Sequence, residues 1–250
     1  MYSLQKASVL RRFSAYLLDI ILLFTVIVGV AALLSLVLNY NSYDTRLDEL
    51  TKAYLEEYDI DINKDYNTLT PEEKANYDAA DKAFKADPEV MYNNQMVTNL
   101  SILIVTFSTL IGYVIMEFII PLILKNGQTL GKKVFAIGVM RVDGVKITTP
   151  FLFVRTILGK YTIETMLPVL MIIMIYFGAM GMMGVIIIGL ILIFNLALLI
   201  TTKTNSAIHD AISQTVTVDM SSQLIFDTPE ALLEYKQRIH EEAAGKASYF

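Results

Sequence analysis

Long runs of apolar residues, rather than helix-period or strand-period stripes, set the hydrophobic pattern of this chain. They cover about residues 13–38, 97–124 and 162–202. About 20 apolar residues in a helix cross the roughly 30 Å hydrocarbon core of a bilayer. The third run has 41 residues, about 61 Å as one helix, which is twice that thickness. It therefore predicts a hairpin of two spans, whose turn falls at the glycines Gly178, Gly181 and Gly184.

The polar segment between the first two runs, residues 39–96, predicts a small helical cap. The sequence Thr-Pro-Glu-Glu from Thr70 is typical of a helix start, with a threonine cap and proline at the first helical position. It predicts a helix to about Lys85, and a second helix is expected at about 47–57.

The segment after the second run combines strand and helix signals. An Asp-Gly pair between residues 134–142 and 145–148 predicts a β-hairpin. Residues 151–160 are apolar with two cations, as expected of a short helix lying in the membrane interface. Residues 215–218 alternate in polarity and are expected to add a third strand.

These patterns predict an all-α multi-pass membrane protein with four transmembrane helices, a small β-hairpin and a helical outer loop. The expected segments are 1–38 (N-terminus and first span), 39–96 (acidic outer loop), 97–124 (second span), 125–161 (basic hairpin and interfacial helix), 162–202 (third and fourth spans) and 203–250 (C-terminal segment).

Loop charges predict the orientation. Residues 125–161 carry seven basic side chains and one acidic, whereas residues 39–96 carry fourteen acidic and six basic. Loops rich in lysine and arginine stay in the cytoplasm. We therefore expect both termini in the cytoplasm, the acidic loop outside, and lysines such as Lys132 and Lys133 against anionic lipid headgroups.

Three polar side chains in the apolar runs are candidates for a substrate or ion site. Asp19 lies roughly 9 Å into the first span at 1.5 Å per residue, and Glu117 and Asn195 lie a similar distance from the ends of the second and fourth. A charged group inside a bilayer is costly and by default a candidate functional site. The alternative is that the three residues only hold helices together.

Three further charged residues are candidates for gating or for structural ion pairs. Arg12 shares a helix face with Asp19 but lies about 10 Å from it along the axis, so it is expected at the interface. Asp210 is expected to pair with an arginine on the cytoplasmic side, Arg12 or Arg155. His209 is expected to pack there.

Three short motifs resemble the RDD family of bacterial membrane proteins. They are Arg12-x-x-Ala15-x-x-x-Asp19, Gly127-Gln-Thr129-Leu-Gly131-Lys132 and His209-Asp210 with Thr215 five residues later. The family's arginine falls on Arg12 and its two aspartates fall on Asp19 and Asp210. The resemblance implies an integral membrane protein with transporter-like features, and it supplies no substrate. The family is typically described with fewer core spans and a shorter outer loop.

Composition narrows the function. Hydrophobic residues make up 54% of the 250-residue chain and charged residues 18%, with no cysteine and two histidines. We find no catalytic set, metal-ligand spacing or cofactor motif, so an enzyme is not expected. The acidic run from Asp59 to Asp65 departs from a calcium loop, since Lys64 stands where glycine is needed.

Two functions remain open from the sequence. One is transport of a cation, proton or small solute through Asp19, Glu117 and Asn195, with four spans requiring a homo-oligomer. The other is a membrane scaffold or assembly factor whose acidic loop binds an extracytoplasmic protein. Both place the chain in a bacterial cell membrane with lipid as a partner, and neither involves nucleic acid.

Overall fold

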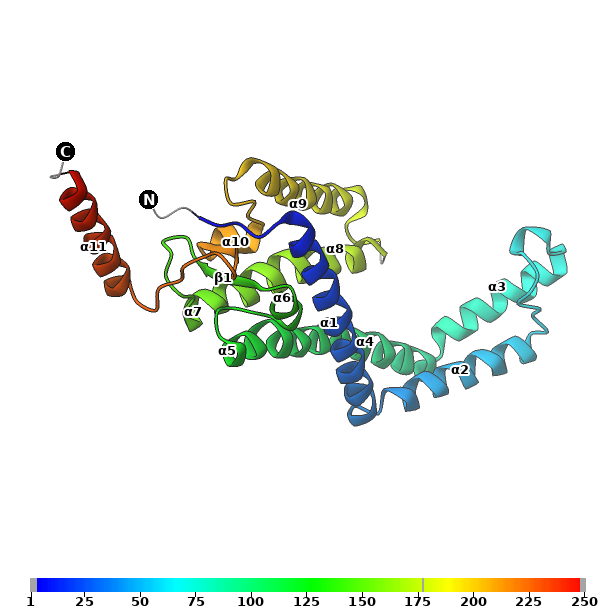
Figure 1. Cartoon of the computed structure of the whole chain (residues 1–250). Helices are drawn as coiled ribbons and strands as arrows, with labels where there is room; N and C mark the ends of the chain where they lie inside the picture. Colours follow the sequence, from blue (N-terminus) through cyan, green and yellow to red (C-terminus); the bar gives the residue numbers. More distant parts are fainter. Residues whose placement is uncertain (1–3, 177, 248–250) are drawn as a thin grey trace. The chain divides into compact units, whose positions relative to one another are not determined.

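The computed structural model of the chain is 74% helical and contains four helical segments long and apolar enough to cross a membrane. It describes residues 4–176 and 178–247, the last three of them by backbone only. Figure 1 shows the elements in sequence order. The four segments are Val9–Val37, Pro88–Leu124, Thr149–Tyr176 and Gly181–Thr201. The predicted number of spans is therefore confirmed.

The chain divides into two units, residues 1–26 with 110–250, and residues 27–109. Helix α1 (Val9–Val37) begins in the larger unit and continues into the smaller one.

The smaller unit contains the acidic segment. After α1 it comprises α2 (Tyr40–Glu57), a short 3-10 turn η1 (Tyr66–Thr68), α3 (Pro71–Ala86) and most of α4 (Pro88–Tyr113). The predicted cap of α3 is confirmed: the Thr70 hydroxyl accepts a bond from the Glu73 N–H, and the Glu73 carboxylate accepts one from the Thr70 N–H. Helix α2 begins earlier than predicted, and α4 starts at Pro88 rather than at about 97.

The second and third spans both contain π-helical turns. The second consists of α4, the π segment η2 (Val114–Ile119) and α5 (Ile120–Leu124). The third consists of α7 (Thr149–Phe153), the π segment η3 (Val154–Met166) and α8 (Leu167–Tyr176). The prediction of a separate interfacial helix at 151–160 is wrong, because the helix runs without a break from Thr149 to Tyr176.

The third and fourth spans form the predicted hairpin. Helix α8 packs against α9 (Gly181–Thr201). Gly178 in the turn and Gly181 at the first residue of α9 adopt positive φ angles of 71° and 47°, which glycine adopts at little cost. Gly184, the third glycine predicted at the turn, lies inside α9 instead. Phe177, within the predicted block 162–202, lies outside the described residues.

A two-stranded antiparallel sheet joins distant parts of the chain. Strand β1 (Ile137–Arg141) pairs with β2 (Thr215–Asp219), with Val139 opposite Thr217. The predicted hairpin partner, residues 145–148, contributes a single bridge between Met140 and Lys146. The sheet forms because β2 has a strand-like alternation of threonine and valine along its length and pairs with the apolar β1. Every residue of β2 is buried.

Two short helices and one longer helix complete the larger unit. Helix α6 (Leu130–Val134) follows the second span, α10 (Ile208–Ile212) follows the fourth, and α11 (Pro229–Ala247) ends the described chain. None of the three was expected from the sequence. Two of them, α6 and α10, carry family-motif residues and position the charged groups described next.

Candidate functional site

The Asp19 carboxylate binds the start of helix α6. One oxygen accepts a hydrogen bond of 2.7 Å from the backbone N–H of Gly131, and the other accepts one from the Thr129 hydroxyl. Thr129 is also the cap of α6, because its hydroxyl accepts a bond from the Lys132 N–H. Asp19 is buried, and both of its oxygens are occupied. The motif threonine and glycine are therefore the partners of the motif aspartate.

Gly131 is required by close packing. A Cβ atom at this position would lie 2.3 Å from the backbone oxygen of Ala15 and 2.8 Å from Oδ1 of Asp19. A backbone carbonyl cannot rotate away as a side chain can. Only glycine allows α6 to approach α1 closely enough for the Asp19 carboxylate to accept the hydrogen bond from the Gly131 N–H.

Gly127, the first motif glycine, is required by backbone conformation. Its φ angle is +60°, and a Cβ atom there would lie 2.9 Å from Cβ of Val139. The turn ahead of α6 therefore packs directly on strand β1.

Glu117 and Lys160 form an ion pair inside the membrane-spanning segments. Glu117 lies in η2 of the second span and Lys160 in η3 of the third, and the Lys160 ammonium donates to Oε2 of Glu117. Their side chains are only 9% and 12% exposed. The Thr156 hydroxyl adds a 2.8 Å bond to the backbone oxygen of Glu117. The pair thus joins two spans at the level of their π-helical turns.

Lys132 approaches this pair without joining it. It is half-buried on α6 and interacts electrostatically with Lys160, Glu117, Arg155 and Asp19. Among the described residues its ammonium makes neither a hydrogen bond nor an ion pair. Burial and the positive charge of Lys160 lower the pKa of Lys132 to about 8.

Asp210 is the centre of a second buried cluster. Its Oδ1 accepts a hydrogen bond from the Arg155 guanidinium, which also donates a 2.6 Å bond to the Thr215 hydroxyl. Arg12 lies 3.9 Å from Oδ2 and donates a 2.9 Å bond to the backbone oxygen of Asn205. The predicted pairing of Asp210 with Arg12 or Arg155 is confirmed, and both arginines take part.

The neighbouring cations keep the Asp210 carboxylate ionised. Burial by itself would raise its pKa, but the charge and hydrogen bond of Arg155, together with the charges of His209 and Arg12, outweigh burial and hold the pKa well below its usual range. The side chains of Arg155 and Asp210 are 4% and 2% exposed. The pair therefore stays charged in the protein interior.

His209 links this cluster to the third span. Its backbone N–H donates a 3.0 Å bond to Oε1 of Glu164, and its Nδ1 lies 2.8 Å from Oε2. Burial lowers the pKa of His209. Helix α10 packs closely here, since a Cβ atom on Gly159 would lie 2.6 Å from Cβ of His209.

The three residues predicted to share one polar layer have separate partners. Asn195 accepts a 3.3 Å bond from the Ile208 N–H, Glu117 binds Lys160, and Asp19 binds α6. Within residues 4–176 and 178–247, no hydrogen bond or ion pair joins any two of the three. Lys132 interacts electrostatically with both Asp19 and Glu117.

Sequence reasoning missed Lys160 as the partner of Glu117. It assigned residues 151–160 to an interfacial helix and so placed this lysine outside the spans. The sequence did carry a signal for this pair, because a buried carboxylate in one span needs a cationic side chain at a similar depth in a neighbouring span. Glu164 was also missed as the partner of His209.

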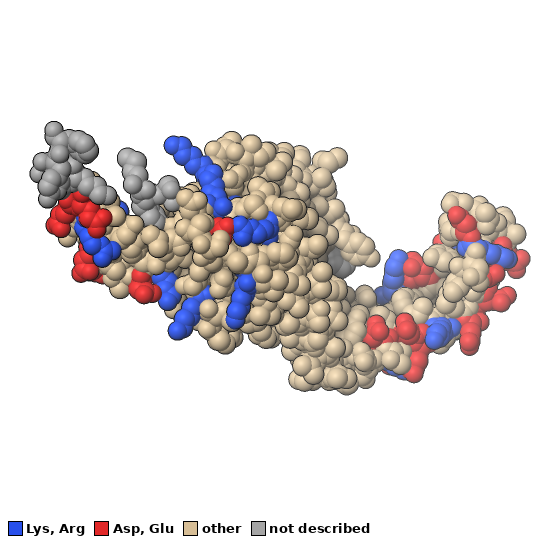
Figure 2. All heavy atoms as spheres, in the orientation of Figure 1, with Lys and Arg blue, Asp and Glu red and all other residues tan. Residues whose placement is uncertain are grey.

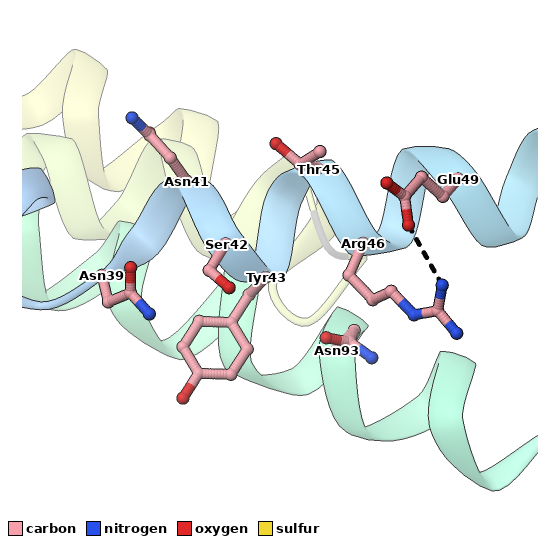
Figure 3. A pocket seen from close by; sticks show the side chains of 8 residues that line it. All are labelled: Asn39, Asn41, Ser42, Tyr43, Thr45, Arg46, Glu49 and Asn93. Atoms are coloured by element: carbon pink, nitrogen blue, oxygen red, sulfur yellow. Dashed lines mark hydrogen bonds and ion pairs between the residues drawn. The ribbon is translucent and has the colours of Figure 1, made fainter.

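A polar groove lies on the smaller unit. It has a volume of about 580 Å³, is open to solvent and lies along α2 beside α4 (Figure 3). Arg46 lines the groove and donates a 2.7 Å hydrogen bond to Glu89 and a 3.0 Å hydrogen bond to Glu49. Its lining residues are Asn39, Asn41, Ser42, Tyr43, Thr45, Arg46, Glu49 and Asn93.

Comparison with known proteins identifies the family. Neither a search of curated proteins nor a search of solved structures found a match to this chain. The family model described as "RDD family" matches residues 6–214, a range that includes Arg12, Asp19 and Asp210. With more than half of its length matched and four apolar helices of spanning length, the chain belongs to the RDD family of membrane proteins.

Proposed function

We propose that this protein transports protons or other small cations across a bacterial cytoplasmic membrane, with the Glu117–Lys160 ion pair as the exchange site. The observation that supports the proposal is the position of this pair, buried between two membrane-spanning helices at their π-helical turns. Ionisable groups inside a membrane are costly and mark ion or proton pathways. π-Helical backbone is rare and, where it occurs within α-helices, is frequent at functional sites.

The chemistry of the site is competition for one carboxylate. A cation that binds the Glu117 carboxylate takes the place of the Lys160 ammonium as its counter-charge. The displaced ammonium is then left without a counter-ion, which favours release of the cation and return of Lys160 to the carboxylate. An ion pair that opens and closes in this way lets a cation bind the carboxylate without being held there.

The other polar residues hold the site in shape. Asp19 and Thr129 fix α6, and Asn195 fixes the chain after the fourth span by accepting the Ile208 N–H bond. The cluster of Asp210, Arg155 and Arg12 ties the third span to α10 beside the exchange site. In this proposal the basic side faces the cytoplasm, and the transporting form is a homo-oligomer.

Flux in reconstituted vesicles tests the proposal. Protein in vesicles with an internal pH dye is given an inward gradient of Na⁺, K⁺ or protons. Wild-type protein is expected to carry flux, and Glu117→Gln and Lys160→Met to lose it while remaining folded. Lys133→Met, an exposed change on neighbouring α6, serves as the matched control. Unchanged flux in Glu117→Gln, or no wild-type flux under any gradient, contradicts the proposal.

A second function is favoured by the charge of the smaller unit. Acidic side chains gather over α2 and α3 (Figure 2), and the polar groove of Figure 3 lies on the same unit. A basic protein outside the membrane would complement this surface, as expected of a scaffold or assembly factor. Replacing residues 41–87 by a short Gly/Ser linker spares the apolar part of α4. A cross-linked partner lost in this variant, with flux absent from wild type, would favour the scaffold.

A further inference from the structure

Lys132 is the one charged group beside the exchange pair that lacks a counter-ion of its own among the described residues. The carboxylate nearest its helix, Asp19, has both oxygens bound by Thr129 and Gly131. The other neighbouring carboxylate, Glu117, is bound by Lys160. Burial without a partner makes the ammonium less stable relative to the neutral amine than it is for a lysine in water, because burial penalises the charged form.

The position of Lys132 is fixed by the family motif. Its backbone N–H donates to the Thr129 hydroxyl, which itself donates to Asp19. Gly131 allows the close approach of this turn to α1. The motif thus holds a lysine beside Glu117 and Lys160 while leaving its ammonium unbonded.

We propose that Lys132 is the proton-exchanging residue of the site and that, when protonated, it competes with Lys160 for the Glu117 carboxylate. The ammonium releases its proton to water at its exposed side and becomes a neutral amine, which leaves Lys160 on Glu117. Reprotonation by the same route restores the competing charge, and no other bond forms or breaks. This inference rests on the proposed transport function, which it makes dependent on pH.

The charged groups around Lys132 set the direction of each effect. Lys160 and Arg155 disfavour its protonation, whereas Glu117 and Asp19 favour it. Removing a neighbouring cation should therefore raise the pH at which Lys132 loses its proton. Removing a neighbouring carboxylate should lower that pH.

Competitive acylation of the full-length protein measures this directly. The protein in lipid nanodiscs is labelled with limiting acetic anhydride as the pH is raised from neutral, and each lysine peptide is quantified by mass spectrometry. The reactivity of Lys132 is expected to rise with a midpoint near pH 8. The midpoint should move up in Lys160→Met and down in Glu117→Gln, by up to about one pH unit, equivalent to a tenfold change in the proton equilibrium. Lys133, exposed on the same turn, is the internal reference.

A vesicle assay separates a proton-exchanging lysine from a merely structural charge. Arginine keeps the positive charge but does not deprotonate at these pH values. Lys132→Arg and Lys132→Met, both with wild-type thermal stability, are therefore both expected to lose the pH dependence of flux. Recovery of the wild-type pH profile by Lys132→Arg would overturn the inference.

The two proposals fail in different ways. Identical midpoints for Lys132 and Lys133 that do not respond to Lys160→Met or Glu117→Gln would overturn the assignment of Lys132 whatever the flux. Absence of flux in wild-type vesicles would refute transport, while the acylation midpoints would still decide whether Lys132 exchanges its proton beside Glu117.

Discussion

The carboxylate of Asp19 accepts a 2.7 Å hydrogen bond from the backbone N–H of Gly131, 112 residues further along the chain. The bond joins the first span to a five-residue helix after the second span. A buried carboxylate with two such donors is stabilised without a cation. The family aspartate in the first span is therefore an anchor for α6 and, through α6, for Lys132.

Gly131→Ala is expected to destabilise the protein by about 1–3 kcal/mol, the usual cost of forcing extra volume into a packed interior. The added Cβ would lie 2.3 Å from the Ala15 carbonyl oxygen and would push α6 off Asp19. Gly189→Ala in α9 is the matched control, since a Cβ there meets nothing within 4 Å. Thermal unfolding in detergent measures both. Equal melting temperatures for the two variants would show that α6 can move away without cost.

Substitutions of Thr129 test how much the hydrogen bond from its hydroxyl to Asp19 stabilises the protein. Thr129→Val removes the donor to Asp19 and the cap of α6 while keeping the shape, so a loss of about 1–3 kcal/mol is expected from leaving a buried carboxylate oxygen unbonded. Thr129→Ser keeps the hydroxyl and should retain most of the stability. Chemical denaturation of the two variants in detergent checks the ordering. Equal losses in both would mean that the methyl group matters and the hydrogen bond does not.

Substitutions in the Arg155–Asp210 pair should be among those that lower the stability of the folded protein most. Arg155→Met leaves the buried Asp210 charge with Arg12 at 3.9 Å and the His209 ring at 3.6 Å but without its direct cationic partner, and a loss of about 3–5 kcal/mol is expected. Arg155→Met combined with Asp210→Asn should recover part of this loss, because the unpaired charge is gone. A double-mutant cycle of unfolding free energies measures the coupling between them.

The control for that cycle is an exposed pair. Lys85 and Asp81 form an ion pair one turn apart on α3, with side chains 71% and 46% exposed. Lys85→Met should leave the unfolding transition unchanged, since water already solvates both charges. A loss as large as that of Arg155→Met would mean that burial does not explain the sensitivity of the Arg155–Asp210 pair.

His209 should make stability fall at mildly acidic pH. Burial lowers its pKa below the ordinary value of 6.5, so the unfolded chain takes up a proton at a higher pH than the folded protein does. Its contribution to stability is full above about pH 6.5 and is lost as the pH falls below that value. The neighbouring charges that oppose or favour its protonation are Arg155, Asp210 and Glu164.

Melting temperature as a function of pH tests this effect. His209→Asn keeps a group at the position of Nδ1 to bind Glu164 but does not titrate. The difference in melting temperature between wild type and this variant should narrow or reverse as the pH falls from 7.5 to 5.5. Parallel curves for the two proteins would mean that His209 has the same pKa in the folded and unfolded chains.

The sequence by itself determined the elements that depend on local pattern. Three runs of apolar residues, the third long enough for two spans, predicted four spans, because a bilayer requires long apolar helices whatever their neighbours. The cap at Thr70 and the glycine turn near Gly178 were also predictable, since each depends on a few adjacent residues. The pairing of Asp210 with an arginine followed from the cost of an isolated buried charge.

Only the tertiary structure decided which distant residues meet. The pairing of β1 with β2, the bonds from α6 to Asp19 and the Glu117–Lys160 pair each join residues separated by 43 positions or more. A single sequence records the presence of such groups but not their contacts, because these depend on how the spans pack. Asp19 illustrates the difference: its charge in an apolar helix predicted a partner, and only packing showed that the partner is a helix end rather than a cation.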